Sequence, residues 1–450
     1  MAKQQKDVVA KYLKHYAEPE SVVGTRLSKL TDHLLVIPAH NESATFLEGI
    51  RPALTAAHDR GQRTVCIVVV NATEASSQRI HDTNQNLLTS LKSHGPTARL
   101  HTFNETPCWH VETKHFDLVL IDKNSQHNRL PKREGVGLAR KIGCDVALSY
   151  LHAGLSRAKF IHMSDCDVQL PDDYFTMTAP TSSAAVVYPF RHVPCGNTVL
   201  DEAHARYEAY LRYYILGLRY ANSPYAFHTL GSCIAIESRA YAGVRGIPKR
   251  EAGEDFYVLN KLAKLGKIHT AKSSPITIRA RVSLRVPFGT GRATRELVKD
   301  INAYRIYAPK LFALLRVWLL ALGGIGLSSP DKVYDIVRRS LTATLPPQDF
   351  KRLDTALQAI QAPKALREAT TRSTLNQVRQ KWAHDWFDGF RTLKLLHALR
   401  NTGIEDRPWR QALSEASFCR SPNTDLDALL SDQGQTFETC RYLAALENLN

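Results

Sequence analysis

Short, largely apolar segments alternate with segments of helical periodicity in the first 170 residues of the chain. Four runs are rich in Val, Ile or Leu and end at a polar residue or a proline: residues 33–38, 64–70, 116–122 and 160–163. Apolar residues recur every three or four positions between them, which predicts helices over residues 44–57, 74–92 and 138–152. A run that is apolar throughout is typical of a strand covered on both faces. The pattern therefore predicts an α/β fold that binds ligands beyond the carboxyl ends of its strands.

The pattern changes along the rest of the chain. Strand and helix signals are mixed up to about residue 300, with one long helix expected over 200–220, and beyond that point helices are separated by prolines. We therefore expect three parts: a helical lead-in (1–30), an α/β domain (31–300) and a helical C-terminal region (301–450).

The most apolar stretch of the helical region is Leu311–Leu327. Arg316 lies within it, and Gly323-Gly324 follows towards its end, so it is short of a clean apolar span of membrane length. We interpret it as a buried or interfacial helix.

The chain carries 59 Lys and Arg residues against 43 Asp and Glu, a formal net charge of +16. This excess is compatible with anionic substrates, nucleic acid or an anionic membrane surface. The cations are spread along the chain, which favours a generally positive surface over a nucleic-acid-binding arm, so no nucleic-acid partner is expected. The eight cysteines are scattered without a Cys-x-x-Cys pair, and no secretory signal is apparent. A cytoplasmic location, with peripheral contact at the inner membrane surface as an alternative, is expected.

Asp165-Cys166-Asp167 follows the apolar run at 160–163 and is the strongest chemical signal. Paired carboxylates at the end of a buried strand are costly to desolvate unless a cation meets them. On a strand the two side chains would point the same way and form half of a site for Mg²⁺ or Mn²⁺. The alternative is an acidic turn or helix N-cap leading into Asp172-Asp173.

Together with Asp165–Asp167, three further segments follow one another along the chain in the same order as the sequence motifs of a known family. Val36–Glu42 resembles the first strand and turn of family 2 glycosyltransferases, and Gly137–Arg140 their helix before the Asp-x-Asp motif. Asp165–Asp167 resembles that metal motif, and Gly253–Asp255, in which Glu254 is 89 residues after Asp165, is similar to their acceptor motif. The resemblance implies the GT-A fold of nucleotide-diphospho-sugar transferases, a Rossmann-like mixed sheet, with a helical C-terminal region after it.

The resemblance also implies a donor site for a nucleotide sugar. Asp167 would hold a divalent metal that neutralises the donor diphosphate, and Asp165 would bind the metal or the ribose. The remaining candidates for nucleotide or substrate binding are Pro38, His40, Asn41 and Glu42 in the first turn, Asn71 and Asp122 at the ends of two strands, and Arg140. Turn and cap chemistry is the alternative interpretation of these positions.

The acceptor side of the expected site contains Glu254 and Asp255. An inverting transferase needs a carboxylate that takes the proton of the attacking hydroxyl, and Asp255 is the candidate, with Glu254 orienting it or the acceptor. Acidic residues also favour helix N-termini for electrostatic reasons. Arg281 and Arg285 belong to a set of arginines that would line one face of a strand-like segment, and they could bind a diphosphate or an anionic acceptor. A solvated edge strand is the alternative.

We therefore expect a metal-dependent glycosyltransferase that moves one sugar from a nucleotide donor to a hydroxyl acceptor, which could be anionic or lipid-linked. The Gln-x-x-Arg-Trp motif of processive synthases is absent from the sequence. Three alternatives remain: a retaining GT-A enzyme that acts on a small anionic acceptor, a nucleotidyltransferase, and an inactive basic binding or scaffold protein of this fold. The Pro38–Glu42 turn lacks the glycine-rich loop and lysine that a nucleotidyltransferase would need.

Overall fold

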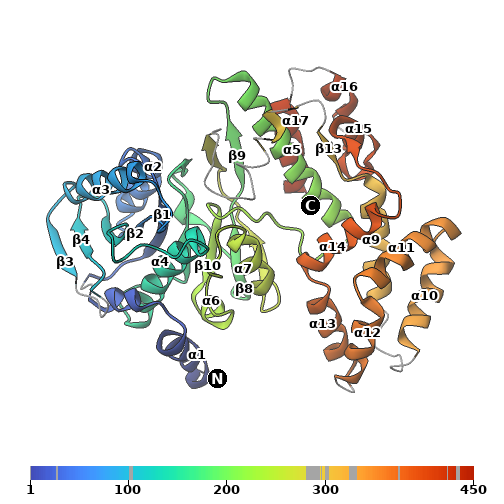
Figure 1. The fold of residues 1–450 in the computed structure, drawn as a ribbon, viewed down its shortest axis with the longest axis horizontal. Coiled ribbons are helices and arrows are strands. Elements are labelled where there is room, and N and C mark those ends of the chain that lie inside the picture. The colour runs from blue at the N-terminus through green and yellow to red at the C-terminus, as the bar shows by residue number, and fades with distance from the viewer. Residues whose placement is uncertain are drawn as a thin grey trace. The chain divides into compact units, whose positions relative to one another are not determined.

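The computed structural model describes residues 2–26, 29–100, 105–279, 294, 296–298, 300, 304–323, 332–372, 375–422, 424–431 and 436–449. The chain divides into two compact units (Figure 1). Unit 1 is Met1–Asn197 with Thr229–Ala293, and unit 2 is Thr198–His228 with Thr294–Asn450. The predicted α/β class is confirmed.

Unit 1 is built on a nine-stranded sheet with the order β11-β8-β10-β6-β1-β2-β5-β4-β3. Its centre consists of four parallel strands, as the apolar runs predicted: β1 (His33–Ala39), β2 (Thr64–Asn71), β5 (Asp117–Lys123) and β6 (Phe160–Met163). All eight residues of β2 are buried. The carboxyl ends of these strands meet at one edge of the sheet.

The outer strands make the sheet mixed rather than parallel. On one side β10 runs antiparallel to both β6 and β8, and β11 pairs parallel with β8. On the other side β4 and β3 form antiparallel pairs beyond β5. Their bounds are β3 (Thr97–Leu100), β4 (Cys108–Glu112), β8 (Ser183–Val187), β10 (Ile234–Glu237) and β11 (Lys267–Thr270). A second sheet of three strands comprises β7 (Val168–Gln169), β9 (Phe190–Val193) and β12 (Ile276–Arg279).

Helix α4 (Gly135–His152) is the central helix of unit 1. Every residue from Gly137 to Tyr150 is buried, and the helix packs on β1 and β2. A Cβ atom at Gly143 would lie 2.4 Å from Cγ1 of Val36, so a glycine is what lets the helix approach the sheet this closely. The other helices of the unit are α2 (Phe46–Asp59), α3 (Gln78–Lys92), α6 (Ser238–Gly243), α7 (Glu254–Leu262) and the short 3₁₀ helix η2 (Tyr174–Thr176).

The N-terminal segment belongs to unit 1 and is not a separate lead-in. It consists of α1 (Ala2–His15) and the 3₁₀ helix η1 (Pro19–Arg26), which pack on α4 and α6. Tyr12 donates a hydrogen bond to the buried carboxylate of Asp145 at 2.6 Å, and Lys141 forms an ion pair with the same carboxylate at 2.8 Å. Lys141 also donates to the carbonyl of Tyr16 at 2.8 Å. A buried charge pair thus holds the segment against α4.

Unit 2 is helical, and it includes a segment that the sequence analysis had placed in the α/β domain. Helix α5 (Thr198–Tyr220), predicted over 200–220, packs with α9 (Pro309–Leu322) and α17 (Thr436–Leu449). A Cβ at Gly217 would lie 2.6 Å from the ring of Phe312. The predicted 31–300 domain is therefore corrected, because the apolar face of α5 is buried in the core of unit 2.

The remaining elements of unit 2 surround this core. They are β13 (Arg305–Ile306), α10 (Val333–Thr344), α11 (Pro347–Ala359), α12 (Ala362–Thr371), α13 (Asn376–Trp386), α14 (Gly389–Arg400), β14 (Arg407–Pro408), α15 (Trp409–Glu415), η4 (Ser417–Cys419) and α16 (Leu426–Ser431). Helix α9 occupies most of the apolar stretch 311–327, with Trp318 fully buried. Among the described residues, no helix is long and apolar enough to cross a membrane.

The buried pair of Lys141 and Asp145 predicts a stability effect. In Asp145→Asn the lysine keeps its charge and loses its nearest counterion, while Glu18 remains at 3.7 Å, so we expect the free energy of unfolding of unit 1 to fall by about 3 kcal/mol, the lower end for a broken buried pair. Hydrogen exchange of peptides from α1 and α4, measured by mass spectrometry, would report the loss. Arg157→Gln is the control, because it removes an ion pair whose arginine side chain is 69% exposed, and the exchange should hardly change. Equal protection in Asp145→Asn and the parent would contradict the expectation.

Candidate active site

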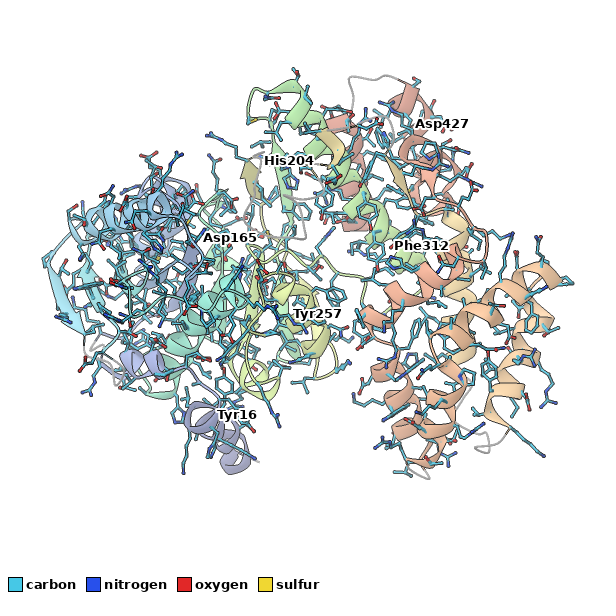
Figure 2. All side chains as sticks on the ribbon, viewed as in Figure 1. Tyr16, Asp165, His204, Tyr257, Phe312 and Asp427 are labelled. Carbon is cyan, nitrogen blue, oxygen red and sulfur yellow. The ribbon has the colours of Figure 1, made fainter. Side chains whose placement is uncertain are left out.

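The guanidinium group of Arg140, in α4, joins two of the predicted motifs. Its Nη2 donates to Oδ1 of Asp165 at 2.7 Å, and its Nε donates to Oε1 of Glu254 at 2.9 Å. Its Nη1 donates to the carbonyl oxygen of Gly231 at 3.0 Å. The side chain is only 5% exposed, so its charge is neutralised by the two carboxylates and not by water. Figure 2 labels Asp165 and Tyr257, which mark the β6 side and the α7 side of this site.

Two glycines make room for this arrangement. The amide of Gly137 donates to the carbonyl of Arg250 at 3.0 Å, and a Cβ at Gly137 would lie 2.5 Å from the carbonyl oxygen of Pro248. A Cβ at Gly231 would lie 2.5 Å from Nη2 of Arg140. The first glycine lets the loop that leads to Glu254 contact the start of α4, and the second leaves space for the guanidinium group.

Glu254 and Asp255 begin helix α7, as the sequence predicted. Gly253 precedes them with a φ of 72°, a conformation that glycine adopts without a steric penalty. Glu254 is 4% exposed, whereas Asp255 is half-buried and accepts a hydrogen bond from the amide of Phe256 at 2.7 Å. Burial and then the neighbouring charge of Glu254 raise the pKa of Asp255 to about 7, against the opposing effects of the Phe256 amide and Arg140. Asp165 also raises this pKa, which places its charge within electrostatic reach of Asp255.

Asp165 and Asp167 lie in the turn between β6 and β7. The expectation that both would extend from a strand on one face is therefore wrong, because β6 ends at Met163. The turn is fixed to the first strand: the amide of Ser164 donates to the carbonyl of Val36 at 3.0 Å, and Sγ of Cys166 lies 3.7 Å from the carbonyl of Pro38. The Asp165 side chain is 32% exposed and Asp167 is also half-buried.

Cys233 marks a third segment at this turn. Burial raises the pKa of its thiol to about 12, and the charges of both Asp165 and Asp167 act in the same direction. The segment from Gly231 to Cys233 therefore contacts Arg140 and lies within electrostatic reach of the two aspartates. Sequence analysis missed it, since an isolated glycine before an apolar strand gives no signal of its contact with an arginine.

The turn after β1 holds His40 and Asn41 in defined positions. Nδ1 of His40 lies 2.8 Å from the carbonyl oxygen of Asn71, and since a carbonyl only accepts, Nδ1 carries the proton. Asn41 has a φ of 56°, and its amide donates to Oδ1 of Asn84 at 2.9 Å. Glu42 is half-buried and follows in the same turn. The turn therefore lies over the carboxyl ends of β1 and β2.

Asn71 and Asp122 stabilise this edge of the sheet through their own side chains. Nδ2 of Asn71 donates to the carbonyls of Ala39 and Val69, each at 3.1 Å. The carboxylate of Asp122 accepts from the amides of Asn124 and Ser125 at 2.8 and 3.0 Å and from the Ser125 hydroxyl. Both side chains are almost fully buried, and Asn71 contacts the turn that contains His40, whereas Asp122 holds the turn after β5.

Asn84 connects these turns and was not predicted from the sequence. Its Nδ2 donates to the carbonyl of Asn71 at 2.9 Å and to Oδ1 of Asn124 at 3.2 Å. Asn71, Asn84 and Asn124 are all buried. A lone Asn in a helix such as α3 has no local signal that distinguishes it from an ordinary surface position.

The two aspartates of the β6–β7 turn have donor chemistry that fits a divalent ion. Their carboxylate oxygens are hard ligands, and both side chains are partly accessible. One carboxylate oxygen of Asp165 accepts a hydrogen bond from Arg140. Over the residues that the structure covers, no group of three or more His, Cys, Asp or Glu side chains is arranged to hold a metal. The rest of a shell here would come from water and substrate phosphates, as is common for Mg²⁺.

Arg281 and Arg285, proposed as anion-binding residues, lie outside the described residues. The structure thus brings together Arg140, Asp165 and Glu254 directly, with Asp255 and Asp167 close to them. The candidates of the first turn form a neighbouring group.

Comparisons with known proteins assign no family. No protein-family model matches the chain, and no curated protein matches it. The resemblance drawn from the motifs therefore remains an expectation.

The raised pKa of Asp255 predicts a pH-dependent stability. Because the folded-state pKa of about 7 lies above the ordinary aspartate pKa of 3.8, the protonated carboxyl group favours folding at low pH, and this contribution is lost as the pH rises through 7. Asp255→Asn is neutral at every pH. We therefore expect its stability relative to the parent to rise by about 2–3 kcal/mol between about pH 5 and about pH 8.

Urea denaturation of both proteins at the two pH values would measure the difference. Asp172→Asn is the matched control, because Asp172 is an exposed aspartate of the same chain region. A stability difference between Asp255→Asn and the parent that does not change with pH would show that the carboxyl group titrates normally.

Proposed function

We propose that the chain is a metal-dependent glycosyltransferase of the GT-A type that transfers a sugar from a nucleotide-diphosphate sugar to an acceptor hydroxyl. One observation carries the proposal: the buried guanidinium group of Arg140 forms ion pairs with both Asp165 and Glu254. These two carboxylates come from the segments that resemble the metal motif and the acceptor motif. A glycosyltransferase needs its donor site and its acceptor site to be adjacent. The ion pairs of Arg140 with both carboxylates support this adjacency.

The donor side of the site is formed by the turns after β1 and β6. Asp167, with Asp165, would hold Mg²⁺ or Mn²⁺. When bound, this ion would neutralise the diphosphate and stabilise it as a leaving group. Arg140 fixes the orientation of Asp165, because Nη2 holds one of its carboxylate oxygens. His40 and Asn41 lie at the carboxyl ends of β1 and β2, where nucleotides bind in open α/β sheets.

The acceptor side is formed by the start of α7. A base with a pKa of about 7 is partly deprotonated at neutral pH and still basic enough to accept a proton. As the acceptor oxygen bonds to the anomeric carbon, the bond from that carbon to the diphosphate oxygen breaks, and the hydroxyl proton passes to the carboxylate of Asp255. Glu254 is held by Arg140 and raises the pKa of Asp255 through its charge.

The raised pKa of Asp255 helps to choose between the inverting transferase, the retaining transferase and the inactive scaffold. An inverting reaction needs a general base on the acceptor, whereas a retaining reaction on a small anionic acceptor does not need Asp255 in that role. Carboxyl groups with strongly shifted pKa values are commonest at functional sites, which favours an active enzyme over an inactive scaffold. The inverting transferase is therefore the function that we favour.

Substitution of the proposed base should remove turnover but not donor binding. We expect Asp255→Asn to lower kcat by about 10²–10⁴-fold, the usual contribution of general acid–base catalysis. Asp167→Ala should also lose activity, and it should lose the thermal stabilisation that a nucleoside diphosphate gives in the presence of Mn²⁺. Release of nucleoside diphosphate from a panel of sugar nucleotides, with and without acceptors, would measure turnover.

The matched control for these variants is Asp172→Asn, an exposed acidic residue five positions after Asp167. It should keep both turnover and the stabilisation by nucleotide. Activity of Asp167→Ala equal to that of the parent, or turnover that does not respond to removal of divalent ions by a chelator, would refute the proposal.

The proposed base also predicts the pH profile. Because Asp255 must be deprotonated to accept the proton, kcat/KM should rise with pH and level off above about pH 7. Glu254→Gln removes the negative charge that raises this pKa, so the rise should move to lower pH. A profile with the same midpoint in both proteins would show that another group controls the rate.

A further inference from the structure

One face of helix α13, in unit 2, has an apolar stripe at helical spacing. Val378 is three residues after Leu375, and Trp382 and Trp386 follow at intervals of four, which places these side chains on one side of the helix. Leu375 is 65% exposed, the highest value among the large apolar side chains that the structure describes, and Val378 is 45% exposed. The two tryptophans are half-buried against the core of unit 2. Phe390, at the start of α14, is 37% exposed.

Three aromatic rings of this region, those of Trp382, Trp386 and Phe390, have a cation over the ring face. The guanidinium carbon of Arg372 lies 5.4 Å from the ring centroid of Trp382, and that of Arg391 lies 4.8 Å from the centroid of Trp386. Nζ of Lys394 lies 4.8 Å from the ring centroid of Phe390. These cation–π contacts hold the positive charges beside the apolar stripe, so the two features form one surface. We call the stripe, Phe390 and these three cations the α13 surface; Figure 1 labels α13 and α14.

Acidic residues do little to offset these cations. Residues 362–394 contain seven lysines and arginines and only three acidic residues: Glu368, Asp385 and Asp388. Asp385 pairs with Lys381 at 2.7 Å, and Asp388 is buried, where it accepts from the amide of Arg391 as the N-cap of α14. Of the helices that pack on α13, α12 contributes Glu368 and α9 has no acidic residue. The surface is therefore positively charged.

We propose that the α13 surface binds the anionic surface of a lipid bilayer. Leu375 and Val378 would enter the interfacial layer, the tryptophans would lie at headgroup depth, and the cations would contact anionic headgroups. Nucleic acid fits less well, because stacking of bases needs open aromatic faces, and here cations cover those faces. The proposal goes beyond the transferase function and does not depend on it; an enzyme bound in this way would meet lipid-borne acceptors.

Co-sedimentation of the full chain with vesicles tests this surface. We expect the protein to bind vesicles of phosphatidylcholine with phosphatidylglycerol at low salt, to be released by high salt, and to bind vesicles of phosphatidylcholine alone much more weakly. The double variant Leu375→Asp with Val378→Asp should partition at least about tenfold more weakly, because it places charges in the apolar stripe. Arg372→Gln with Lys394→Gln should weaken binding to the anionic vesicles by about tenfold.

The matched control is Leu265→Asp, which changes a leucine of unit 1 that is 57% exposed, and it should bind vesicles as the parent does. No binding of the parent to anionic vesicles, or equal binding by the Leu375 and Val378 double variant, would overturn the proposal. So would self-association that the double variant abolishes in sedimentation velocity while vesicle binding is unchanged, since the surface would then be an interface between copies. No sugar nucleotide is present in these assays, so they are independent of whether the transferase proposal holds.

Discussion

The site of unit 1 depends on the buried charge of Arg140. Removal of a guanidinium group from water costs several kcal/mol unless carboxylates and other acceptors replace the lost hydration. Here Asp165, Glu254 and the Gly231 carbonyl supply that replacement, and they come from three segments far apart in the sequence. In this fold the burial of Arg140 therefore ties these segments together. The arrangement of the site thus follows from the need to compensate one buried positive charge. The carboxylates of Asp165 and Glu254 are oriented by their hydrogen bonds to Arg140.

The next residue of the same helix extends this constraint to the N-terminus. Lys141 is also buried, and its ion pair with Asp145 is surrounded by Tyr12 and the carbonyl of Tyr16. Glu18, just beyond, pairs with Lys249 at 2.9 Å, in the loop that leads to Glu254. The two adjacent cations of α4 thus have different partners. Arg140 binds the carboxylates of the site, and Lys141 binds the N-terminal segment, whose Glu18 contacts the loop that leads to Glu254. This is why residues 1–30 belong to unit 1, although a polar helical segment at the start of a sequence suggests an appendage.

The sequence predicted those features that a local pattern encodes. The apolar runs of β1, β2, β5 and β6 and the helix α5 were found because their periodicity and composition are local properties. The edge strand β3 was not, because it is short and largely exposed and so has no apolar alternation. The motifs singled out Asp165 and Asp255 as candidates, but the sequence could not show that the buried Arg140 would form ion pairs with Asp165 and Glu254. Nor could it show that Asn71 and Asp122 would hold the chain's own turns. Such roles depend on contacts between distant segments. The prediction that residues 200–220 belong to the α/β domain was wrong for the same reason, since an apolar helix face does not reveal what covers it.

The net charge of +16 does not by itself show where the protein surface is positive. In unit 1 several cations are used inside the fold: Arg63 pairs with the buried Asp117 at 2.5 Å, Lys123 with Glu20 at 2.9 Å, and Arg140 and Lys141 with their own carboxylates. Such pairs contribute little to the field outside the protein, because the opposite charges lie within a few ångströms of each other. Around α13 the cations lie over aromatic rings instead, and a ring partner leaves the full positive charge in place. The cations named in unit 1 stabilise the fold, because carboxylates are their partners. Those around α13 leave a positive surface that attracts anions, because aromatic rings are their partners.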